Sequence, residues 1–277
     1  MRLSKICCQL FFVAMLCTLL LRPIDVVGAE TLYMKSQKAL EAAAAIADSS
    51  DWCFIFLGDS HGNDEKLKEM LEATVKIKPL FILHGGDVSH RGSAEEFTSF
   101  LKMAGSVKDL PPLFVIRGNH ESDPVLFERM LGPLDFVLDS SRLGLRLVAI
   151  DNSNYAVGSD ALKLLSKQLD RSRPYQFVAM HIPPATERWS RHSFEKGKSE
   201  LLDLLVSRKV RFGLFAHTHL FDKDEYRGVP LLISAGAGSQ LAWFGYPGEA
   251  VYHMVVVEVK KGLVSYRVVR FATTLMP

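Results

Sequence analysis

Two histidines, His217 and His219, lie one residue apart in the segment FAHTHLF (215–221), at the end of a run of apolar residues typical of a buried strand. A strand directs residues i and i+2 to the same face, so both imidazoles are expected to face one site. Imidazole nitrogens bind Zn, Mn and Fe. A pair of core histidines with ordinary hydrogen bonds fits the same short pattern, so the pair alone does not establish a metal site.

Four other apolar runs end in residues of the same chemical kind. Asp59 and His61 follow the first run, and Asp87 follows the second. Asn119 follows the third, and His181 ends another. One polar residue at a strand end is unremarkable, because Asp and Asn are common turn formers. The candidate ligands are Asp59, His61, Asp87, Asn119, His181, His217 and His219. Together they exceed the number that one tetrahedral metal site needs, and they predict two divalent ions that share one carboxylate.

A regular alternation of strands and helices must position these side chains. The apolar runs are nearly continuous, as in strands that are buried on both faces, and they predict strands over 52–57, 80–84, 113–117, 145–150, 177–181 and 212–217. Amphipathic segments between them predict helices over 64–77, 159–170 and 198–208, and Ser93 and Glu96 form a capping box for another. Ligands of such sheets bind beyond the carboxyl ends of the strands.

The end of the chain follows a different pattern. From residue 229 onward no helix is predicted, and three further strands follow, the last two joined by the turn KKG (260–262). A short turn of this kind joins antiparallel strands, so a second or mixed sheet is expected. No repeat or linker interrupts 30–277, which we interpret as a single domain.

The first 29 residues predict a secretory signal peptide. Arg2 and Lys5 precede an apolar run that reaches Leu21, and Val27 and Ala29 suit the −3 and −1 positions of a cleavage site after Ala29. An uncleaved membrane anchor is the alternative, but the apolar run is short for a full span. We therefore expect a secreted or periplasmic protein, in contact with a membrane only through this segment if it is not cleaved.

The composition excludes several classes of function. Of the 277 residues, 48% are hydrophobic and 23% charged, as in ordinary globular proteins. The formal charge is +2, so the broad basic surface of a nucleic-acid-binding protein is not expected. Three of the four cysteines lie in the first 29 residues, which leaves no cysteine cluster for a structural zinc site.

The ordered set of motifs resembles the calcineurin-like metallophosphoesterases. The segments that carry the resemblance are GDSH (58–61), GGDVSHRG (85–92), GNHE (118–121), MHIPP (180–184) and AHTH (216–219), within about residues 52–220. The resemblance implies the α/β fold of that family, a two-sheet αββα sandwich. Each motif alone is weak evidence, and the five in order are specific.

The resemblance also implies a role for each residue. Asp59, His61 and His219 would hold the first metal ion, and Asn119, His181 and His217 the second. Asp87 would bridge the two ions. His120 would contact the substrate phosphate and protonate the leaving oxygen. Arg91, in the position of a phosphate-binding arginine of the Ser/Thr protein phosphatases, is a further candidate for substrate binding, and Arg117 in RGNHE is another. For both, a surface or ion-paired arginine is the alternative.

The implied activity is hydrolysis of a small-molecule phosphate mono- or diester. Two divalent ions (Mn, Fe or Zn) neutralise the anionic ester, and metal-bound water has its pKa lowered from 15.7 to near 7, which supplies hydroxide at neutral pH. A general acid adds roughly 10²–10⁴-fold by protonating the leaving group. The alternative is a non-catalytic scaffold or binding module with this fold, which would not need the complete set of ligands.

Two departures narrow the subclass. Purple acid phosphatases carry a tyrosine three residues after the bridging aspartate, where this chain has His90, so a purple ferric-tyrosinate centre is not expected. The Ser/Thr protein phosphatases carry an aspartate there that orients the catalytic histidine. Its absence leaves open what orients His120, and Glu121 or a backbone group is a candidate. The HTH motif is typical of the phosphodiesterase and acid-phosphatase branches.

Two loops are expected near the site. The polar segment 182–198 contains Arg188, Trp189, Arg191 and His192, which either contact substrate or face solvent. The segment 238–250 contains Trp243, Phe244 and Tyr246, which either line an aromatic wall or pack. Loops of this kind carry function more often than core segments do, but the sequence does not decide between these interpretations.

Overall fold

The computed structural model describes residues 30–242 and 246–272. The predicted signal peptide, together with Trp243 and Phe244, lies outside the described residues. All of the described helices and strands belong to the unit that begins at Thr31. None of the helices in the described ranges combines the length and the apolar character that a membrane crossing requires.

Two mixed sheets form the centre of this unit. The first has the order β11 (Leu263–Phe271), β10 (Tyr252–Lys260), β1 (Asp51–Leu57), β2 (Ile82–His84) and β3 (Leu113–Val115). The second has the order β4 (Phe136–Ser140), β5 (Leu145–Ala149), β6 (Tyr175–Ala179), β7 (Phe212–Phe215), β9 (Val229–Ser234) and β8 (Phe221–Tyr226). The last two strands in sequence pair antiparallel, which confirms the predicted hairpin.

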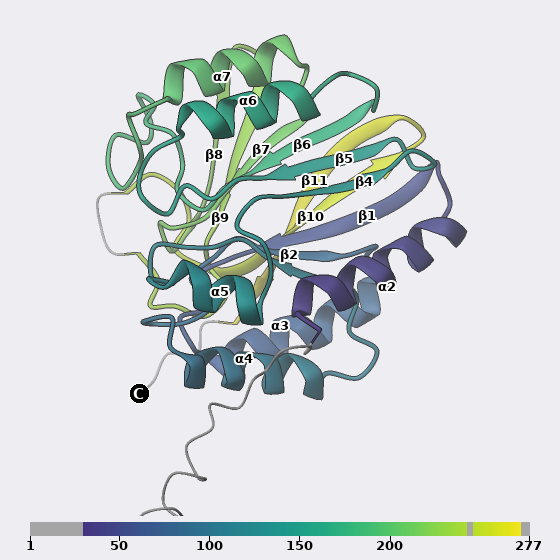
Figure 1. The fold of residues 1–277 in the computed structure, drawn as a ribbon, viewed down its shortest axis with the longest axis vertical. Helices are drawn as coiled ribbons and strands as arrows, with labels where there is room; N and C mark the ends of the chain where they lie inside the picture. The colour runs from purple at the N-terminus through teal and green to yellow at the C-terminus, as the bar shows by residue number, and fades with distance from the viewer. Residues whose placement is uncertain (1–29, 243–245, 273–277) are drawn as a thin grey trace, which may run out of the picture. The chain divides into compact units, whose positions relative to one another are not determined.

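Helices cover the outer faces of both sheets, as Figure 1 shows. The helices α3 (Asp64–Ile77) and α4 (Ala94–Ser106) lie against the first sheet, and α6 (Ser159–Gln168) and α7 (Lys198–Ser207) lie against the second. The helix α2 (Leu32–Ile46) packs beside β3 and β4, and α5 (Pro124–Met130) buries Phe127 against the α3 and α4 side. The layers are helix, sheet, sheet, helix, and the αββα sandwich is confirmed.

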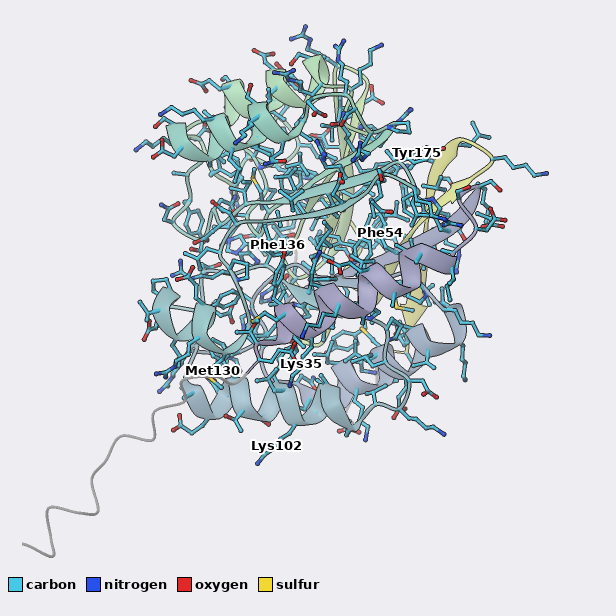
Figure 2. The ribbon with its side chains drawn as sticks, turned by 45° about the vertical axis from the view of Figure 1, so that its right-hand side comes forward. Lys35, Phe54, Lys102, Met130, Phe136 and Tyr175 are labelled. Carbon is cyan, nitrogen blue, oxygen red and sulfur yellow. The ribbon has the colours of Figure 1, made fainter. Side chains whose placement is uncertain are left out.

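The alternation of side chains along β1 shows why its sequence is apolar throughout. Phe54 and Phe56 enter the core between the two sheets, whereas Ile55 and Leu57 pack under α3 and α4. All four side chains are fully buried, and each contributes about 1.5–3 kcal/mol of hydrophobic stabilisation. In Figure 2, Phe54 and Phe136 lie inside the fold, while Lys102 points outward from α4.

The sequence pattern missed α5 and two strands, β4 and β8, that lie at edges of the second sheet. In β8, the sequence FDKDEY places exposed Lys223 and Glu225 among buried and half-buried neighbours. Edge strands often carry such charges, because charged residues discourage pairing with other molecules. The apolar content of these strands is therefore too low to stand out beside the central strands.

Candidate metal centre

The loops that follow five strands meet at one end of the sandwich. Backbone hydrogen bonds join the first two of these loops, from Asp59 N to Gly86 O (3.0 Å) and from His61 N to Asp87 O (2.9 Å). A further bond joins the two sheets, because His217 N donates to Asp59 Oδ2 at 2.9 Å. The predicted ligand residues therefore share one framework, although they come from distant parts of the chain.

Four atoms that can serve as metal ligands lie close together around Nε2 of His181. The Nε2 atom of His181 lies 3.2 Å from Asp87 Oδ2, 3.0 Å from Asn119 Oδ1 and 3.2 Å from His217 Nδ1. His181 is fully buried, and Asp87 is 1% exposed. Asp87, His181 and His217 each offer an atom within the spacing that one metal ion requires. This arrangement brings together the residues predicted for the second ion.

A second point lies between Asp59, His61 and His219, whose ligand atoms lie within 4.8 Å of one another. Asp59 Oδ1 is 3.6 Å from His219 Nε2. Asp59 Oδ1 and His61 Nε2 are buried, yet neither has a hydrogen-bond partner among the described residues. Buried polar atoms are normally paired, so these two atoms fit a bound cation. These are the residues predicted for the first ion.

Asp87 lies between the two points. Its Oδ2 atom is 3.2 Å from His181 Nε2 on one side and 3.3 Å from His61 Nε2 on the other. Its Oδ1 atom accepts a hydrogen bond from His120 N at 3.0 Å. One carboxylate therefore faces both groups of donors, as the predicted bridging residue must.

Three imidazoles of the cluster, those of His181, His217 and His219, have one nitrogen hydrogen-bonded to a neighbour. His181 Nδ1 donates to Gly85 O, and His219 Nδ1 donates to Gln240 O, each at 2.8 Å. These bonds fix the tautomer and leave Nε2 directed at the cluster, as outer partners of metal-binding histidines do. The ring of His217 is turned the other way, with Nδ1 toward His181 and Nε2 on the hydroxyl of Tyr155 at 2.9 Å.

The backbone at the cluster is strained rather than strand-like. The strand β7 ends at Phe215, so His217 and His219 lie beyond it, and the expected alternation of a strand does not direct their rings. Both have positive φ, 76° and 55° respectively. Asp59, His61 and Asp87 also lie in this left-handed region, which costs on the order of 1–3 kcal/mol per residue and is concentrated at functional sites.

Gly118 allows the third loop to approach the bridging residue. A Cβ atom at this position would lie 2.1 Å from Asp87 Oδ1 and 2.4 Å from Asp87 N. No side chain fits in that space, so the glycine of GNHE permits the close packing of the loops after β2 and β3.

Burial and charge set the protonation of the cluster in the absence of a cation. Burial opposes protonation of His181, but the attraction of Asp87 outweighs it and raises the pKa of His181 to about 10. Burial lowers the pKa of His217 to about 2 and that of His219 to about 4. Burial also opposes ionisation of Asp87, but His181 holds its pKa well below the ordinary value. The carboxylate of Asp87 and the neutral imidazoles of His217 and His219 are the forms that bind metal ions, whereas His181 carries a proton that a bound ion would displace.

A backbone carbonyl orients His120. His120 Nδ1 lies 2.8 Å from His90 O and donates to it, so Nε2 is the nitrogen free to face the pocket. The ring lies 4.4 Å from the ring of His61, and His61, Asp87 and His120 form another group with metal-ligand spacing. The geometry therefore permits a catalytic role and a ligand role for His120, which a variant can separate.

The carboxylate of Glu121 holds the loops together and makes no hydrogen bond to the ring of His120. Its Oε2 atom accepts from Asp87 N and Gly118 N, both at 2.9 Å, and its Oε1 atom accepts from the backbone and hydroxyl of Ser89. The carboxylate is fully buried. All of these partners are donors, which explains why an acceptor-only side chain stands at this position.

Replacing Glu121 by Gln is expected to destabilise the fold. The amide NH₂ must face donors at one end, which leaves buried polar groups unpaired and costs about 1–3 kcal/mol. Urea denaturation of the chelator-treated protein measures this loss. Glu69→Gln is a matched control, because it is the same substitution at an exposed carboxylate that pairs with Lys66 on the surface of α3. Equal denaturation midpoints for Glu121→Gln and the unaltered protein would contradict the structural role.

Tyr155 is a site residue that the sequence pattern did not single out. It lies in the loop after β5, has a φ of 61°, and lines the same pocket as the histidines. Its hydroxyl is hydrogen-bonded to Nε2 of His217, and the centroids of the two rings lie 5.4 Å apart in an edge-to-face arrangement. The buried amide of Asn152 holds this loop through reciprocal hydrogen bonds with Ile182. The only signal in the sequence is the polar segment DNSN after an apolar run.

The other predicted residues are distributed around the site. Arg91 does not line the metal pocket but lines a neighbouring cavity that shares His90 with it. Arg117 is paired with Asp151 at 2.9 Å, which favours the ion-pair interpretation. Trp189 is buried at 4% exposure and is part of the packing. His192 and Tyr246 line the metal pocket, a cavity of about 870 Å³.

The chain is similar to one known protein family and to several solved structures. A family described as calcineurin-like phosphoesterase matches residues 54–221. No curated protein sequence shows a significant match. Among solved structures, a purple acid phosphatase from seeds of yellow lupin (Lupinus luteus) aligns with a TM-score of 0.65 and 16% identity over 79% of this chain. This chain spans only 52% of the lupin protein.

Two further structures align over most of their length. A protein described as GAP50, the anchor in the inner membrane complex of Plasmodium, has a TM-score of 0.62 and 13% identity, with 80% of this chain and 85% of that chain covered. A dimetal phosphatase from Danio rerio has a TM-score of 0.59 and 12% identity, with 80% and 100% covered. These likenesses establish the fold. The family match over residues 54–221, more than half of the chain, shows that the protein belongs to the calcineurin-like phosphoesterases.

Proposed function

We propose that the protein is an exported phosphoesterase with two divalent ions, and that it hydrolyses a phosphate mono- or diester of a small molecule. The observation that carries this proposal is the position of Asp87. Its Oδ2 atom faces donor atoms of His61 and His181 at 3.3 and 3.2 Å, so one carboxylate is shared by two groups of ligands. A site for a single ion would need only one of these two groups of ligands.

The proposed ligand residues form two groups, one for each ion. Asp59, His61 and His219 would hold the first ion, and Asn119, His181 and His217 the second, with Asp87 common to both. Bound Mn, Fe or Zn would neutralise the phosphate charge and lower the pKa of water near the ester. The fit rests on buried donor atoms that lack other partners and on histidine tautomers that are already fixed.

His120 would supply the proton for the leaving oxygen. Its Nδ1 is committed to the carbonyl of His90, so a proton on Nε2 points into the pocket. The carbonyl also prevents the ring from turning, which keeps the donor in one place as ester cleavage requires. Asp87 fixes the backbone of His120 through Oδ1 and thereby couples the position of the acid to that of the metal site.

Replacing Tyr155 by Phe is expected to weaken the second metal site. The variant removes the hydroxyl that holds Nε2 of His217, and loss of such a partner typically reduces metal affinity or activity by about 10–100-fold. Titration of the metal-free protein with Mn²⁺, followed by calorimetry, measures the affinity directly. Tyr226→Phe is the control, because Tyr226 lies on β8 and its hydroxyl is 3.5 Å from Asp203. Unchanged affinity at both sites in Tyr155→Phe would contradict the positioning role.

A non-catalytic scaffold is the alternative from a different class. The similar Plasmodium structure is described as an anchor, so this fold alone does not imply turnover. The complete set of ligand residues and a free pocket-facing nitrogen on His120 favour the enzyme.

The test uses residues 30–277, purified without chelator. Bound metals are counted, and phosphomonoesters and diesters are assayed with added Mn²⁺. We expect about two ions per chain and turnover of at least one ester class. No turnover of any ester, together with less than one bound ion per chain, would contradict the proposal.

Export is proposed from the first 29 residues. Arg2, Lys5, the apolar run and Ala29 support a cleaved signal peptide. Mass spectrometry of the full-length protein after expression in a bacterial host tests this proposal. We expect a mature chain that begins at Glu30 in the periplasmic fraction, whereas an intact chain in the cytoplasm would contradict it.

A further inference from the structure

A second cavity lies beside the metal pocket. It has a volume of about 570 Å³, and we call it the 187–191 pocket after the loop residues that form one wall. Thr218 and Tyr246 line both this cavity and the metal pocket. Because Thr218 lies between the two predicted ligands His217 and His219, the 187–191 pocket directly adjoins the metal site.

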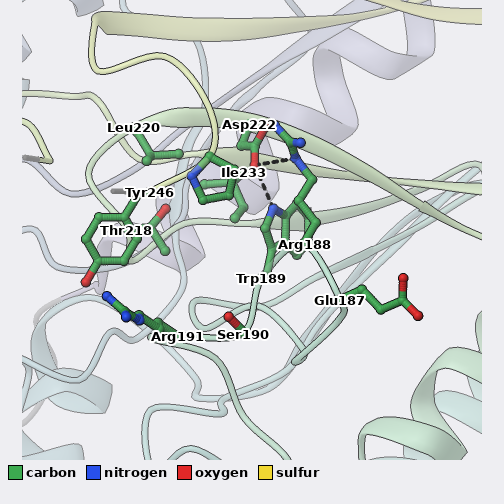
Figure 3. Close-up of a pocket in the computed structure, with 11 residues that line it drawn as sticks. Glu187, Arg188, Trp189, Ser190, Arg191, Thr218, Leu220, Asp222, Ile233 and Tyr246 are labelled. Atoms are coloured by element: carbon green, nitrogen blue, oxygen red, sulfur yellow. Dashed lines mark hydrogen bonds and ion pairs between the residues drawn. The ribbon is translucent and has the colours of Figure 1, made fainter. Parts of the chain in front are cut away.

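The wall of the 187–191 pocket is rigid. Asp222, 3% exposed, accepts hydrogen bonds from Arg188 Nε (2.8 Å), Arg188 Nη2 (2.7 Å) and Trp189 Nε1 (2.8 Å). Figure 3 shows these two side chains converging on the carboxylate. Thr186 adds a bond from its hydroxyl to Asp224 at 2.6 Å, and its Oγ1 accepts from Trp189 N. A wall held in this way loses little entropy when a ligand binds.

The charges of this pocket leave one cation available. The charge of Arg188 is neutralised by Asp222 in a bidentate pair. Arg191 is exposed and has no ion-pair or hydrogen-bond partner among the described residues. In Figure 3, Arg191 lies on the side of Tyr246 and Thr218, whereas Glu187 extends on the opposite side. The free guanidinium thus lies at the end of the cavity that adjoins the metal pocket, and guanidinium groups suit carboxylates and phosphates.

Apolar side chains form another part of the lining. Leu220 is 3% exposed and Ile233 is 1% exposed, and both face the cavity together with buried Trp189. Pockets that combine such surfaces with a few fixed polar groups are typical of small-molecule sites. A ligand that suits this cavity has a carbon framework and an anionic group.

We infer that the 187–191 pocket is a subsite for the leaving group of the substrate, and that this leaving group carries its own anionic group, which binds Arg191. The inference rests on the proposed phosphoesterase activity and specifies its substrate class: phosphate esters of anionic, partly apolar alcohols or phenols. The scissile phosphate lies at the metal site, and the remainder of the molecule extends past Thr218 into the pocket.

The test compares two esters of equal size, 4-carboxyphenyl phosphate and 4-carbamoylphenyl phosphate. The ratio of their kcat/KM values is measured for the unaltered protein, Arg191→Gln, Arg191→Lys and Arg227→Gln. Intrinsic differences in reactivity cancel, because only the change in ratio between proteins is interpreted. Arg227 is the matched control, since it lies in the β8–β9 turn and pairs with Asp203 on the surface.

Arg191→Gln is expected to lower the preference for the carboxylate ester by about tenfold or more, the usual effect of losing a charged hydrogen bond. Arg191→Lys should retain part of the preference for the carboxylate ester, and Arg227→Gln should retain all of that preference. Turnover of both esters with the same ratio in Arg191→Gln and the unaltered protein would overturn the subsite alone. Equal losses in Arg191→Gln and Arg227→Gln would also overturn it, as a general effect of charge. If the protein hydrolyses only diesters, the same ratio is measured on the corresponding methyl diesters. No turnover of these monoesters or diesters by the metal-loaded protein would overturn the proposed function and the subsite with it.

Discussion

An Asp87→Asn variant is expected to lose turnover by on the order of 10³-fold or more, because it removes several kcal/mol of charge stabilisation at a shared ligand. Asn has nearly the same shape, but its amide is neutral and cannot bring a negative charge to both ions. The side chain is 1% exposed and faces both His61 and His181, so no water replaces the lost carboxylate. We also expect fewer than two bound ions per chain.

The measurement combines kcat on a phosphate ester with metal content after gel filtration. Asp160→Asn is the matched control, because Asp160 lies on the surface of α6 and pairs only with Lys163 among the described residues. It should change neither quantity. Full activity in Asp87→Asn with two bound ions would show that the carboxylate does not bridge.

Replacing His120 by Ala is expected to slow turnover by about 10²–10⁴-fold for esters with poor leaving groups. Esters of nitrophenols should be affected much less, because their leaving oxygen needs no proton. Both ions should remain bound, since His120 is oriented by the carbonyl of His90 rather than by the ligand cluster.

The leaving-group dependence separates this role from the alternatives. A steeper dependence of kcat on the leaving-group pKa in His120→Ala than in the unaltered protein identifies a general acid. An equal loss for every ester would point to phosphate binding alone. Loss of a metal ion would assign His120 to the group that it forms with His61 and Asp87.

The strand ends were predictable because two patterns coincide there. A central strand requires a continuous apolar run, and the first polar residues after it mark the edge where ligands gather. The ends of the runs were placed too far along the chain, however. Ala216 and His181 follow the ends of β7 and β6 but are fully buried, because the site packs its own loops as tightly as a core.

Other features of the site arise only from contacts between distant residues. Tyr155 matters through a hydrogen bond to His217, 62 residues away, and a segment rich in Asp, Asn and Ser otherwise predicts only a turn. The group that orients His120 is a backbone carbonyl, which every residue possesses, so no residue type marks it. Arg117 shows the reverse, because its arginine pattern fits phosphate binding but its partner is Asp151.

The most direct test of the two-ion centre is diffraction from crystals of residues 30–277 grown with Mn²⁺, with data collected at the Mn absorption edge. We expect two anomalous peaks about 3.5–4 Å apart, with Asp87 Oδ2 between them, one peak beside Asp59, His61 and His219 and the other beside Asn119, His181 and His217. A single peak, or a pair that Asp87 does not bridge, would contradict the proposed centre.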